Sequence, residues 1–331
     1  MAEQRQTTAR MPLLDRKGRV LRSSWAAEDL FIYNKEAVAF GGAKEWEYYQ
    51  LFDERFVFRL LYGHSRFVGL ARGEFWDRES GRHFVTGPVK FFPGDSYDLD
   101  FSAEDPHHLY AEEENFFLSL DYDGRYRRLR CRGGAFDVEL MLPKNGCALS
   151  TANPFRRRRQ FYCGFRRIFP ELRGRVTLNG QDYPLGERSF AVAESGRGLL
   201  PRRLSRVCGV GCGEVGGRRV AILMGWGFGY ATAGTENALF VDGELIKLNR
   251  IREKRAGESF LERSRFSTGE GRLVLDYDPE EDHYVRKKFP MLDLDSHRTV
   301  GTVSGRILLP EEELTVTELP FLCEHSRFNW W

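Results

Sequence analysis

The segment Phe116–Tyr122, with the sequence FFLSLDY, decides the fold class of this chain. A large apolar residue occupies every second position, with Phe117, Ser119 and Asp121 between them. This period of two is that of a β-strand with one buried face. The pair Asp123-Gly124 follows, and such pairs favour tight turns. The segment therefore predicts a β-strand that ends in a turn.

Strand-length apolar segments of the same kind recur along the chain. They are Arg55–Tyr62, Arg66–Phe75, His83–Phe92, Ala135–Leu142, Arg175–Asn179, Ser189–Ala193, Arg219–Trp226, Asn237–Val241, Arg272–Tyr277, Thr299–Leu308 and Leu314–Leu319. Asn-Gly at 179–180 and Asp-Gly at 242–243 are strong hairpin patterns. No long stretch has the 3.6-residue period of a capped helix, so we expect few and short helices. The pattern predicts an all-β fold of antiparallel sandwich or barrel units.

Length and composition narrow the class of protein further. A chain of 331 residues exceeds one ordinary core and favours two domains. Its 50 Lys and Arg nearly cancel its 48 Asp and Glu, so no overall field attracts DNA or RNA, and we expect no nucleic-acid partner. Aromatic residues make up 14% of the chain, which favours β-structure and apolar-lined cavities.

The sequence lacks the patterns of membrane insertion, secretion and metal binding. It has no run of about 18 uncharged apolar residues, and residues 1–14 lack the apolar core of a secretory signal. We therefore expect a cytoplasmic protein without membrane insertion. Of six cysteines only Cys208 and Cys212 are close, and a zinc site needs a further pair of ligands. We expect no metal and no cofactor.

The segment Thr151–Arg159 is the natural place for a domain boundary. It contains Pro154 and four consecutive arginines at 156–159, which fit poorly inside a core strand. We therefore expect an N-terminal domain over 11–152 and a C-terminal domain over 153–331. Residues 1–10 are polar and are expected to be disordered. The arginine run is either a solvated linker, or some of its guanidinium groups bind an acidic ligand or carboxylates across the domain interface.

Glu194 and Arg197 form the most informative polar pattern of the chain. They follow the strand Ser189–Ala193, and glycines at 196 and 198 allow close backbone approach. Beside apolar walls the pKa of Glu194 would rise and make it a candidate general acid or base, whereas beside Arg197 it would stay ionised. A structural ion pair and a catalytic or ligand-binding role both stay open.

A second polar pattern surrounds Glu236 and Asn237. These residues could present hydrogen-bonding groups into a pocket lined by Trp226, Phe228 and Tyr230. The alternative is turn chemistry at the start of a strand.

Four further candidates lie toward the ends of the chain. Tyr33, Asn34 and Trp46 belong to an aromatic and polar cluster that either lines the pocket from the first domain or forms barrel core. His325 is the histidine to test first, as a proton carrier or as an anchor of the C-terminus.

Several short motifs together give the chain a family resemblance. They are Pro12–Gly18, Ile32–Glu36, Lys44–Tyr49, Glu194–Gly198 with Pro201, Gly227–Gly229, Thr235–Asn237, Asp242–Gly243, Cys323–Ser326 and Asn329–Trp330. On these motifs the chain resembles DUF2804, a bacterial family of unknown function, over nearly its whole length. The family's usual Asp-Trp-Gly-Arg-Gly segment is Glu-Ser-Gly-Arg-Gly here, so a carboxylate and the arginine are kept and the tryptophan is absent.

That family is more distantly similar to two-domain lipocalin-like proteins, which include AttH-type proteins, carotenoid hydratases and tocopherol cyclases. The resemblance implies two consecutive calycin-like antiparallel β-barrels that hold an apolar ligand in a barrel or between barrels. Because fold does not transfer function, this likeness names no reaction.

Two functions stay open on the sequence alone. The first is a cofactor-free enzyme that hydrates, cyclises or isomerises an apolar small molecule, or acts as a lyase. Glu194 would be its acid or base, and Arg197, Asn237 or His325 would stabilise charge. The second is a non-catalytic carrier of a lipid-like ligand. An enzyme predicts a carboxylate inside a semi-enclosed apolar pocket, whereas a carrier predicts charges only at the rim of a larger cavity.

Overall fold

The computed structural model describes residues 4–38, 42–65, 67–289 and 292–330. These residues form 27 β-strands and one 3-10 turn, η1 (Lys35–Ala37). All strand pairs within the three large sheets of the described chain are antiparallel, and only the small sheet of β1 (Met11–Pro12) and β3 (Phe31–Ile32) is parallel. The all-β fold class predicted from the sequence is confirmed. No helix among the described residues is long and apolar enough to cross a membrane.

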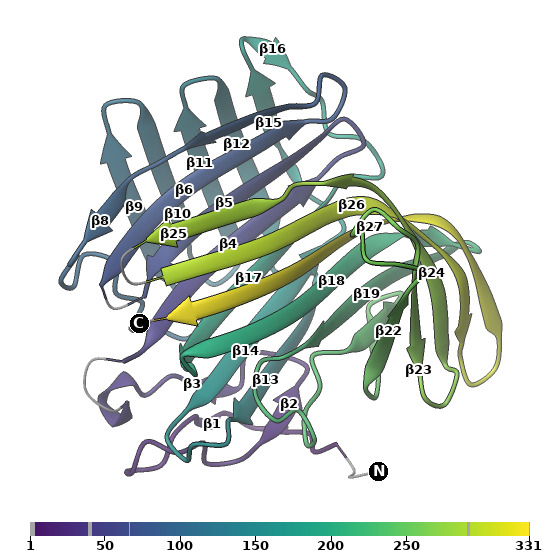
Figure 1. Ribbon diagram of the computed structural model, residues 1–331, viewed down its shortest axis with the longest axis horizontal. Coiled ribbons are helices and arrows are strands. Elements are labelled where there is room, and N and C mark those ends of the chain that lie inside the picture. Colours follow the sequence, from purple (N-terminus) through teal and green to yellow (C-terminus); the bar gives the residue numbers. More distant parts are fainter. Residues whose placement is uncertain (1–3, 39–41, 66, 290–291, 331) are drawn as a thin grey trace.

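A nine-stranded sheet forms the centre of the molecule (Figure 1). Its order is β2 (Ser24–Ala26), β13 (Cys147–Pro154), β14 (Phe161–Phe169), β17 (Phe190–Leu199), β4 (Lys44–Phe52), β5 (Phe56–His64), β6 (Val68–Asp77) and β7 (Arg82–Thr86), with β8 (Val89–Phe91) also paired to β6. Strands distant in sequence, such as β17 and β4, therefore lie side by side.

A six-stranded sheet packs on one face of the central sheet. Its order is β16 (Gln181–Asp182), β15 (Arg173–Leu178), β12 (Phe136–Pro143), β11 (Tyr126–Gly133), β10 (Phe116–Tyr122) and β9 (His107–Glu113). Phe56 and Phe75 of the central sheet belong to one core with Phe136 and Leu118, and the rings of Phe75 and Phe136 stack. The outer face of this sheet is solvated, which is why β10 has the alternating pattern seen in the sequence.

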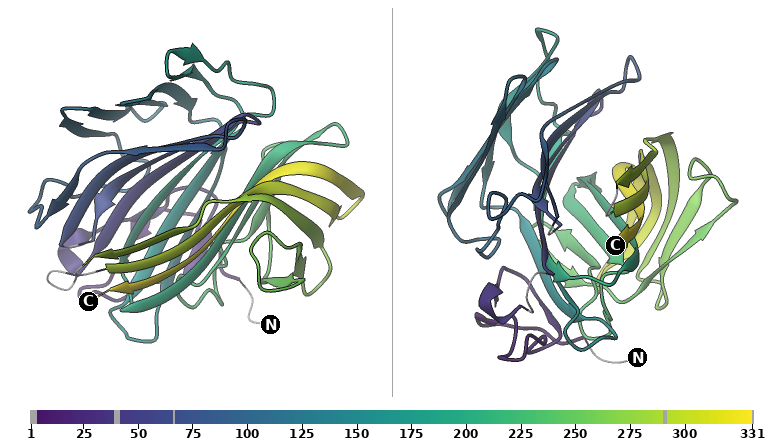
Figure 2. Two further views of the ribbon diagram at one scale, coloured as in Figure 1. Left: turned by 45° about the horizontal axis from the view of Figure 1, so that its top comes forward. Right: turned by 60° about the vertical axis from the view of Figure 1, so that its left-hand side comes forward.

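A ten-stranded sheet covers the other face and curls on itself into a half-barrel. Its order is β21 (Glu244–Lys247), β20 (Ala238–Val241), β19 (Arg218–Trp226), β18 (Arg203–Val215), β27 (Glu313–Trp330), β26 (Leu292–Leu308), β24 (Leu273–Asp282), β23 (Ser264–Thr268) and β22 (Ile251–Arg255), with β25 (Val285–Phe289) paired to β26. Its concave side holds a core of its own around Phe266, Ile307 and Phe321. Figure 2 shows the three layers from the side.

The middle strands of the central sheet are thus buried on both faces, whereas its edge strands β7 and β8 are exposed. Alternate residues of β17 point to opposite sides, with Ala191 and Ala193 in the sandwich core and Phe190 and Val192 against the half-barrel. Nine of the ten residues of β17 are buried. A strand covered on both sides has a continuous buried run, in contrast to the alternation of β10.

The expected domain boundary at 152/153 falls inside strand β13. The four arginines at 156–159 are exposed in the loop between β13 and β14, two neighbouring strands of one sheet. The central and six-stranded sheets take up the chain as far as Leu199, and the half-barrel begins at Arg203. We propose that the division between the two halves lies between these two residues.

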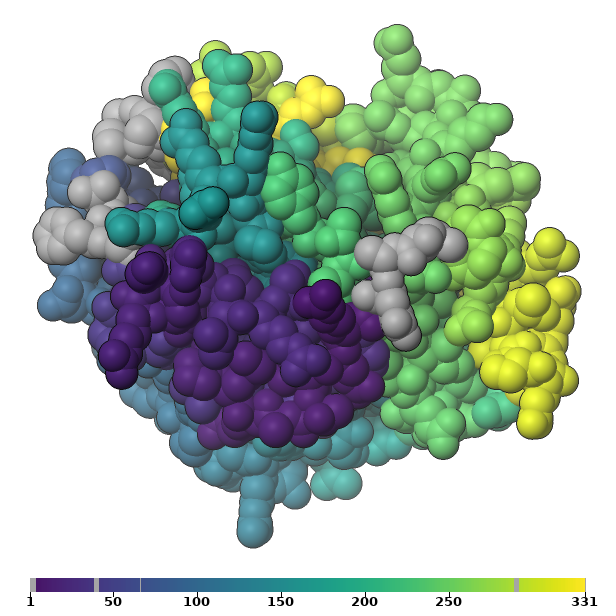
Figure 3. All heavy atoms as spheres, turned by 90° about the horizontal axis from the view of Figure 1, so that it is seen from below, coloured from purple at the N-terminus to yellow at the C-terminus, as the bar shows by residue number. Residues whose placement is uncertain are grey.

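Residues 4–10, which we expected to be disordered, instead contact the rest of the molecule, whereas residues 1–3 lie outside the described chain. Gln6 bridges Trp25, and the Arg5 amide donates to the carbonyl of Ala233. The N-terminal segment lies along the surface beside the half-barrel (Figure 3). Backbone groups of Arg5 and Thr7 are thereby paired, and these pairs hold an otherwise polar segment in place.

We expect Leu223→Ala to lower the free energy of unfolding by about 2–5 kcal/mol, because Leu223 is fully buried between the central sheet and the half-barrel. Urea unfolding measures this loss. The matched control is Leu261→Ala at an exposed position, which should change the free energy by less than about 0.5 kcal/mol. Equal effects of the two substitutions would contradict the packing described above.

Candidate functional site

Glu194 and Arg197 lie on opposite faces of β17. They are three positions apart, and successive side chains of a strand point to alternate sides. Glu194 faces the half-barrel, whereas Arg197 faces the six-stranded sheet and binds Glu47 at 2.8 Å. The Glu194–Arg197 ion pair considered from the sequence is therefore not formed.

Glu194 belongs to a row of side chains that crosses five strands of the central sheet. The register pairs Arg166 of β14 with Glu194, Glu194 with Tyr48 of β4, Tyr48 with Leu61 of β5, and Leu61 with Arg72 of β6. Directly opposite residues in antiparallel strands share a face. The whole row therefore points toward the half-barrel.

The carboxylate of Glu194 accepts three hydrogen bonds. Its donors are Arg166 Nε at 3.0 Å, Arg206 Nη2 of β18 at 2.5 Å and Trp46 Nε1 at 3.2 Å. Burial raises the pKa of Glu194, but the charges of Arg206 and Arg166 outweigh it and hold this pKa at about 2. Glu194 is thus ionised at neutral pH and cannot serve there as a proton donor.

A cavity of about 210 Å³ lies beside this row, between the central sheet and the half-barrel. We call it the inter-sheet cavity. Its apolar wall consists of Trp46, Leu61, Val68, Leu70, Val89, Leu200, Phe228, Val285, Leu292, Leu294, Phe328 and Trp330. Its polar floor consists of Tyr48, Arg59, Arg72, Glu74, Glu194, Arg206, Arg298 and Glu324.

A second ion-pair group in the floor joins the two sheets. Arg298 of β26 binds Glu74 of β6 at 2.8 Å and lies 3.5 Å from Glu324 of β27. Burial raises the pKa of Glu74, and Arg298 with Arg72 outweighs this effect and brings the pKa to about 2. Since the carboxylates of both groups are ionised, the floor is a layer of fixed charges beneath an apolar wall.

Two other candidates named from the sequence reach the same cavity. Trp46 and Phe228 line it, and both rings contact Tyr162, with the Tyr162 and Phe228 centroids 4.1 Å apart. Glu236 lies behind the floor, 3.3 Å from Arg166. The site thus assembles from segments that are far apart in the sequence.

The other candidates of the second polar pattern lie outside the cavity. Asn237 accepts from the Gly225 amide at 2.8 Å and donates to the Asn249 carbonyl, so its side chain binds the backbone of two other segments. Trp226 packs beside the half-barrel core, and Tyr230 is 53% exposed.

The remaining candidates have partners elsewhere. Tyr33 donates to Glu45 at 2.6 Å on the same face as Arg197, and Asn34 binds the Leu14 backbone through two hydrogen bonds. His325 points into the concave side of the half-barrel, where its Nε2 lies 2.8 Å from Glu253. The structure does not bring Arg197 or His325 to Glu194.

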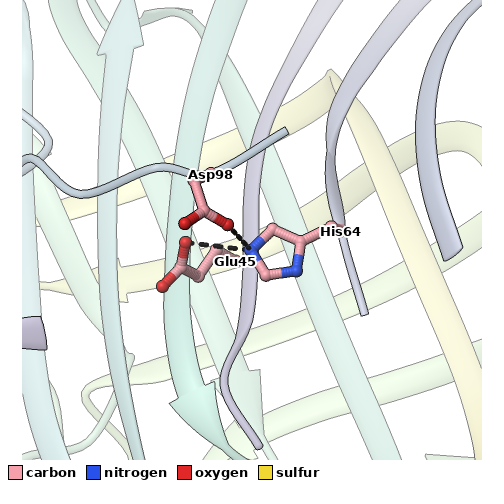
Figure 4. A group of neighbouring side chains, drawn as sticks. All are labelled: Glu45, His64 and Asp98. Carbon is pink, nitrogen blue, oxygen red and sulfur yellow. Dashed lines mark hydrogen bonds and ion pairs between the residues drawn. The ribbon is translucent and has the colours of Figure 1, made fainter. Parts of the chain in front are cut away.

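Glu45, His64 and Asp98 converge as a metal site would require (Figure 4). His64 Nε2 lies 3.0 Å from Glu45 and 3.3 Å from Asp98. However, the ammonium group of Lys35 also lies 3.2 Å from Glu45 and 2.7 Å from Asp98, so a cation already matches the two carboxylates. We assign the group as an ion-pair network.

Sequence reasoning missed the arginines of the floor. Arg59 stands alone within the apolar segment Phe56–Tyr62, and a single charge in a buried strand needs a partner or a function. That pattern was available in the sequence. The pairing of Arg206 with Glu194 was not, because it depends on how the half-barrel docks on the central sheet.

Residues 4–330 match the model of one protein family, "Domain of unknown function (DUF2804)", and the chain belongs to this family. The family resemblance found in the sequence is thereby confirmed. No curated protein matches the sequence.

CghA and kievitone hydratase are among the solved structures that are similar to the chain. CghA is 10% identical, with a TM-score of 0.47, over 98% of this chain and 97% of that one. Kievitone hydratase from Nectria haematococca is 9% identical, with a TM-score of 0.49, over 88% of this chain and 93% of that one. Structural similarity at these identities and TM-scores indicates neither a substrate nor a reaction for this chain.

We expect Glu194→Gln to lower the free energy of unfolding at pH 7 by about 3–5 kcal/mol, because Arg166 and Arg206 lose their shared counter-charge. The folded-state pKa of about 2 lies below the ordinary value of 4.5. The contribution of Glu194 is therefore complete above pH 4.5 and is lost as the pH falls toward 2. Urea unfolding over this range should show the gap between wild type and variant narrowing.

The control for this prediction is Glu139→Gln, which alters a half-exposed carboxylate in surface ion pairs. It should change stability little at any pH. A gap between wild type and Glu194→Gln that stays constant down to pH 2 would show that Glu194 is not ionised by its arginine partners.

Proposed function

We propose that the protein binds an apolar small molecule in the inter-sheet cavity, with the charged floor orienting the polar end of that molecule. One observation carries this proposal. The lining of this cavity combines a wall of leucine, valine and aromatic side chains with a floor of buried charged groups. This is the usual composition of a small-molecule site. The volume of about 210 Å³ suits a compact ligand rather than a long lipid.

Catalysis on the bound molecule is a second candidate, and one feature favours it. The charged groups lie in the floor, and Glu194 is only 4% exposed, whereas a simple carrier would keep its charges at the rim. The chemistry is then restricted. Glu194 and Glu74 are ionised and have low pKa values, so they would stabilise positive charge in a hydration, cyclisation, isomerisation or lyase reaction.

Binding can be tested with the neutral fluorescent probe N-phenyl-1-naphthylamine. Leu294 of β26 lines the cavity, and Leu294→Trp fills part of it. We expect the wild type to bind the probe with enhanced fluorescence and the variant to bind about tenfold more weakly, a difference of about 1.4 kcal/mol.

The matched control is Leu308→Trp, which makes the same change on the same strand at a 46% exposed position outside the cavity. It should bind the probe as the wild type does. If Leu294→Trp and the wild type bind equally, the probe site lies elsewhere and the proposed function is wrong.

A further inference from the structure

Arg59 is the unusual member of the cavity floor. Its side chain is 2% exposed, yet it forms no ion pair with a described carboxylate, in contrast to Arg166, Arg206 and Arg298. Its guanidinium group lies over the Trp76 ring at 4.4 Å. A buried cation without a counter-charge is costly, so its position calls for a physical reason.

The hydrogen bonds of Arg59 leave one nitrogen free. In the orientation that satisfies both groups, the Gln50 side-chain oxygen accepts from Nε at 3.0 Å and from Nη2 at 3.1 Å. Nη1 is buried and has no partner among the described residues. The neutral amide of Gln50 uses two donors of the guanidinium group without cancelling its charge.

Other charges around Arg59 do not supply the missing anion. Six lining residues of the cavity are Lys or Arg and four are Glu, so the lining has an excess of positive charge. Arg298 acts on Arg59 as a like charge and lowers its pKa, whereas Tyr48, Glu324 and Glu74 act in the opposite direction. Burial is the largest effect, and the pKa of Arg59 is lowered overall.

Tyr48 presents a second unpaired donor to the same space. Its hydroxyl oxygen is buried, has no partner among the described residues, and is subject to the charges of Arg59 and Arg298. Burial raises the pKa of Tyr48, so the hydroxyl stays protonated and able to donate. Arg59 Nη1 and Tyr48 Oη are thus unpaired donors in one positively charged floor, and such donors match the needs of an anion.

Resting on the proposed function, we infer that the ligand of the inter-sheet cavity carries an anionic group of the carboxylate type, which accepts hydrogen bonds from Arg59 Nη1 and Tyr48 Oη. The apolar body of the ligand lies against the leucine and valine side chains of the wall. The anion supplies the counter-charge that the protein itself does not give to Arg59. Arg59 is therefore a binding residue. Burying its unpaired charge destabilises the free protein, and the bound ligand offsets this loss.

The test compares 2-naphthoate with 2-naphthamide by isothermal titration calorimetry. The two probes share shape and apolar body and differ in charge. We expect the wild type to bind the naphthoate at least about tenfold more tightly, as a charge-assisted hydrogen bond allows. Arg59→Met should abolish this preference, Tyr48→Phe should reduce it, and Arg219→Met, at an exposed position outside the cavity, should keep it.

A stability measurement separates a binding role from a structural one. Arg59→Met removes an unpaired buried charge, so it should melt at or above the temperature of the wild type without ligand. Arg127→Met removes an equally buried arginine that is paired with Glu104 at 2.5 Å, and it should melt well below the wild type. If the melting temperature of Arg59→Met falls as far below the wild type as that of Arg127→Met, the inference is overturned.

The outcomes of the titration are distinguishable. Equal binding of the two probes by the wild type, or a naphthoate preference that survives in Arg59→Met, overturns the anionic ligand and leaves cavity binding intact. If neither probe binds, the proposed function fails and the inference fails with it.

Discussion

The structure depends on one constraint, which is that the middle strands of its central sheet have no solvated face. The six-stranded sheet covers one side of β17, β4 and β5, and the half-barrel covers the other. A charged side chain on these strands cannot reach water by pointing outward, so it needs a partner from a neighbouring strand or from a facing layer. The polar groups of the molecule are arranged accordingly.

Each face of the central sheet meets this requirement in a different way. On the side of the six-stranded sheet, Arg197 pairs with Glu47. Glu45 contacts Tyr33, His64 and Lys35 on the same side. In these groups the arginine, the lysine and the two glutamates are each paired with an opposite charge. On the half-barrel side, two ion-pair groups centred on Glu194 and on Arg298 join the sheets and leave the inter-sheet cavity between them. Arg59 is the exception on that side, and for this reason it is the most informative residue of the floor.

The sequence predicted local structure better than it predicted partners. The predicted strand Phe116–Tyr122 has the same bounds in the structure, because its alternating residues lie on one buried and one solvated face. Glu194, Trp46 and Phe228 were named as candidates and lie at one cavity, although their role stays a prediction. The period of two could have separated Glu194 from Arg197 in advance. The partners of Glu194 could not be predicted, because Arg206 comes from another sheet, and β17 pairs with β14 and β4 through long-range contacts.

The most direct test of the site is a crystal structure of the protein soaked with 2-naphthoate. We expect the naphthalene rings between the central sheet and the half-barrel, with the carboxylate within hydrogen-bonding distance of Arg59 Nη1 and Tyr48 Oη. Density for the probe on the concave side of the half-barrel near His325, or between the central and six-stranded sheets near Arg197, would contradict the assignment of the inter-sheet cavity as the ligand site.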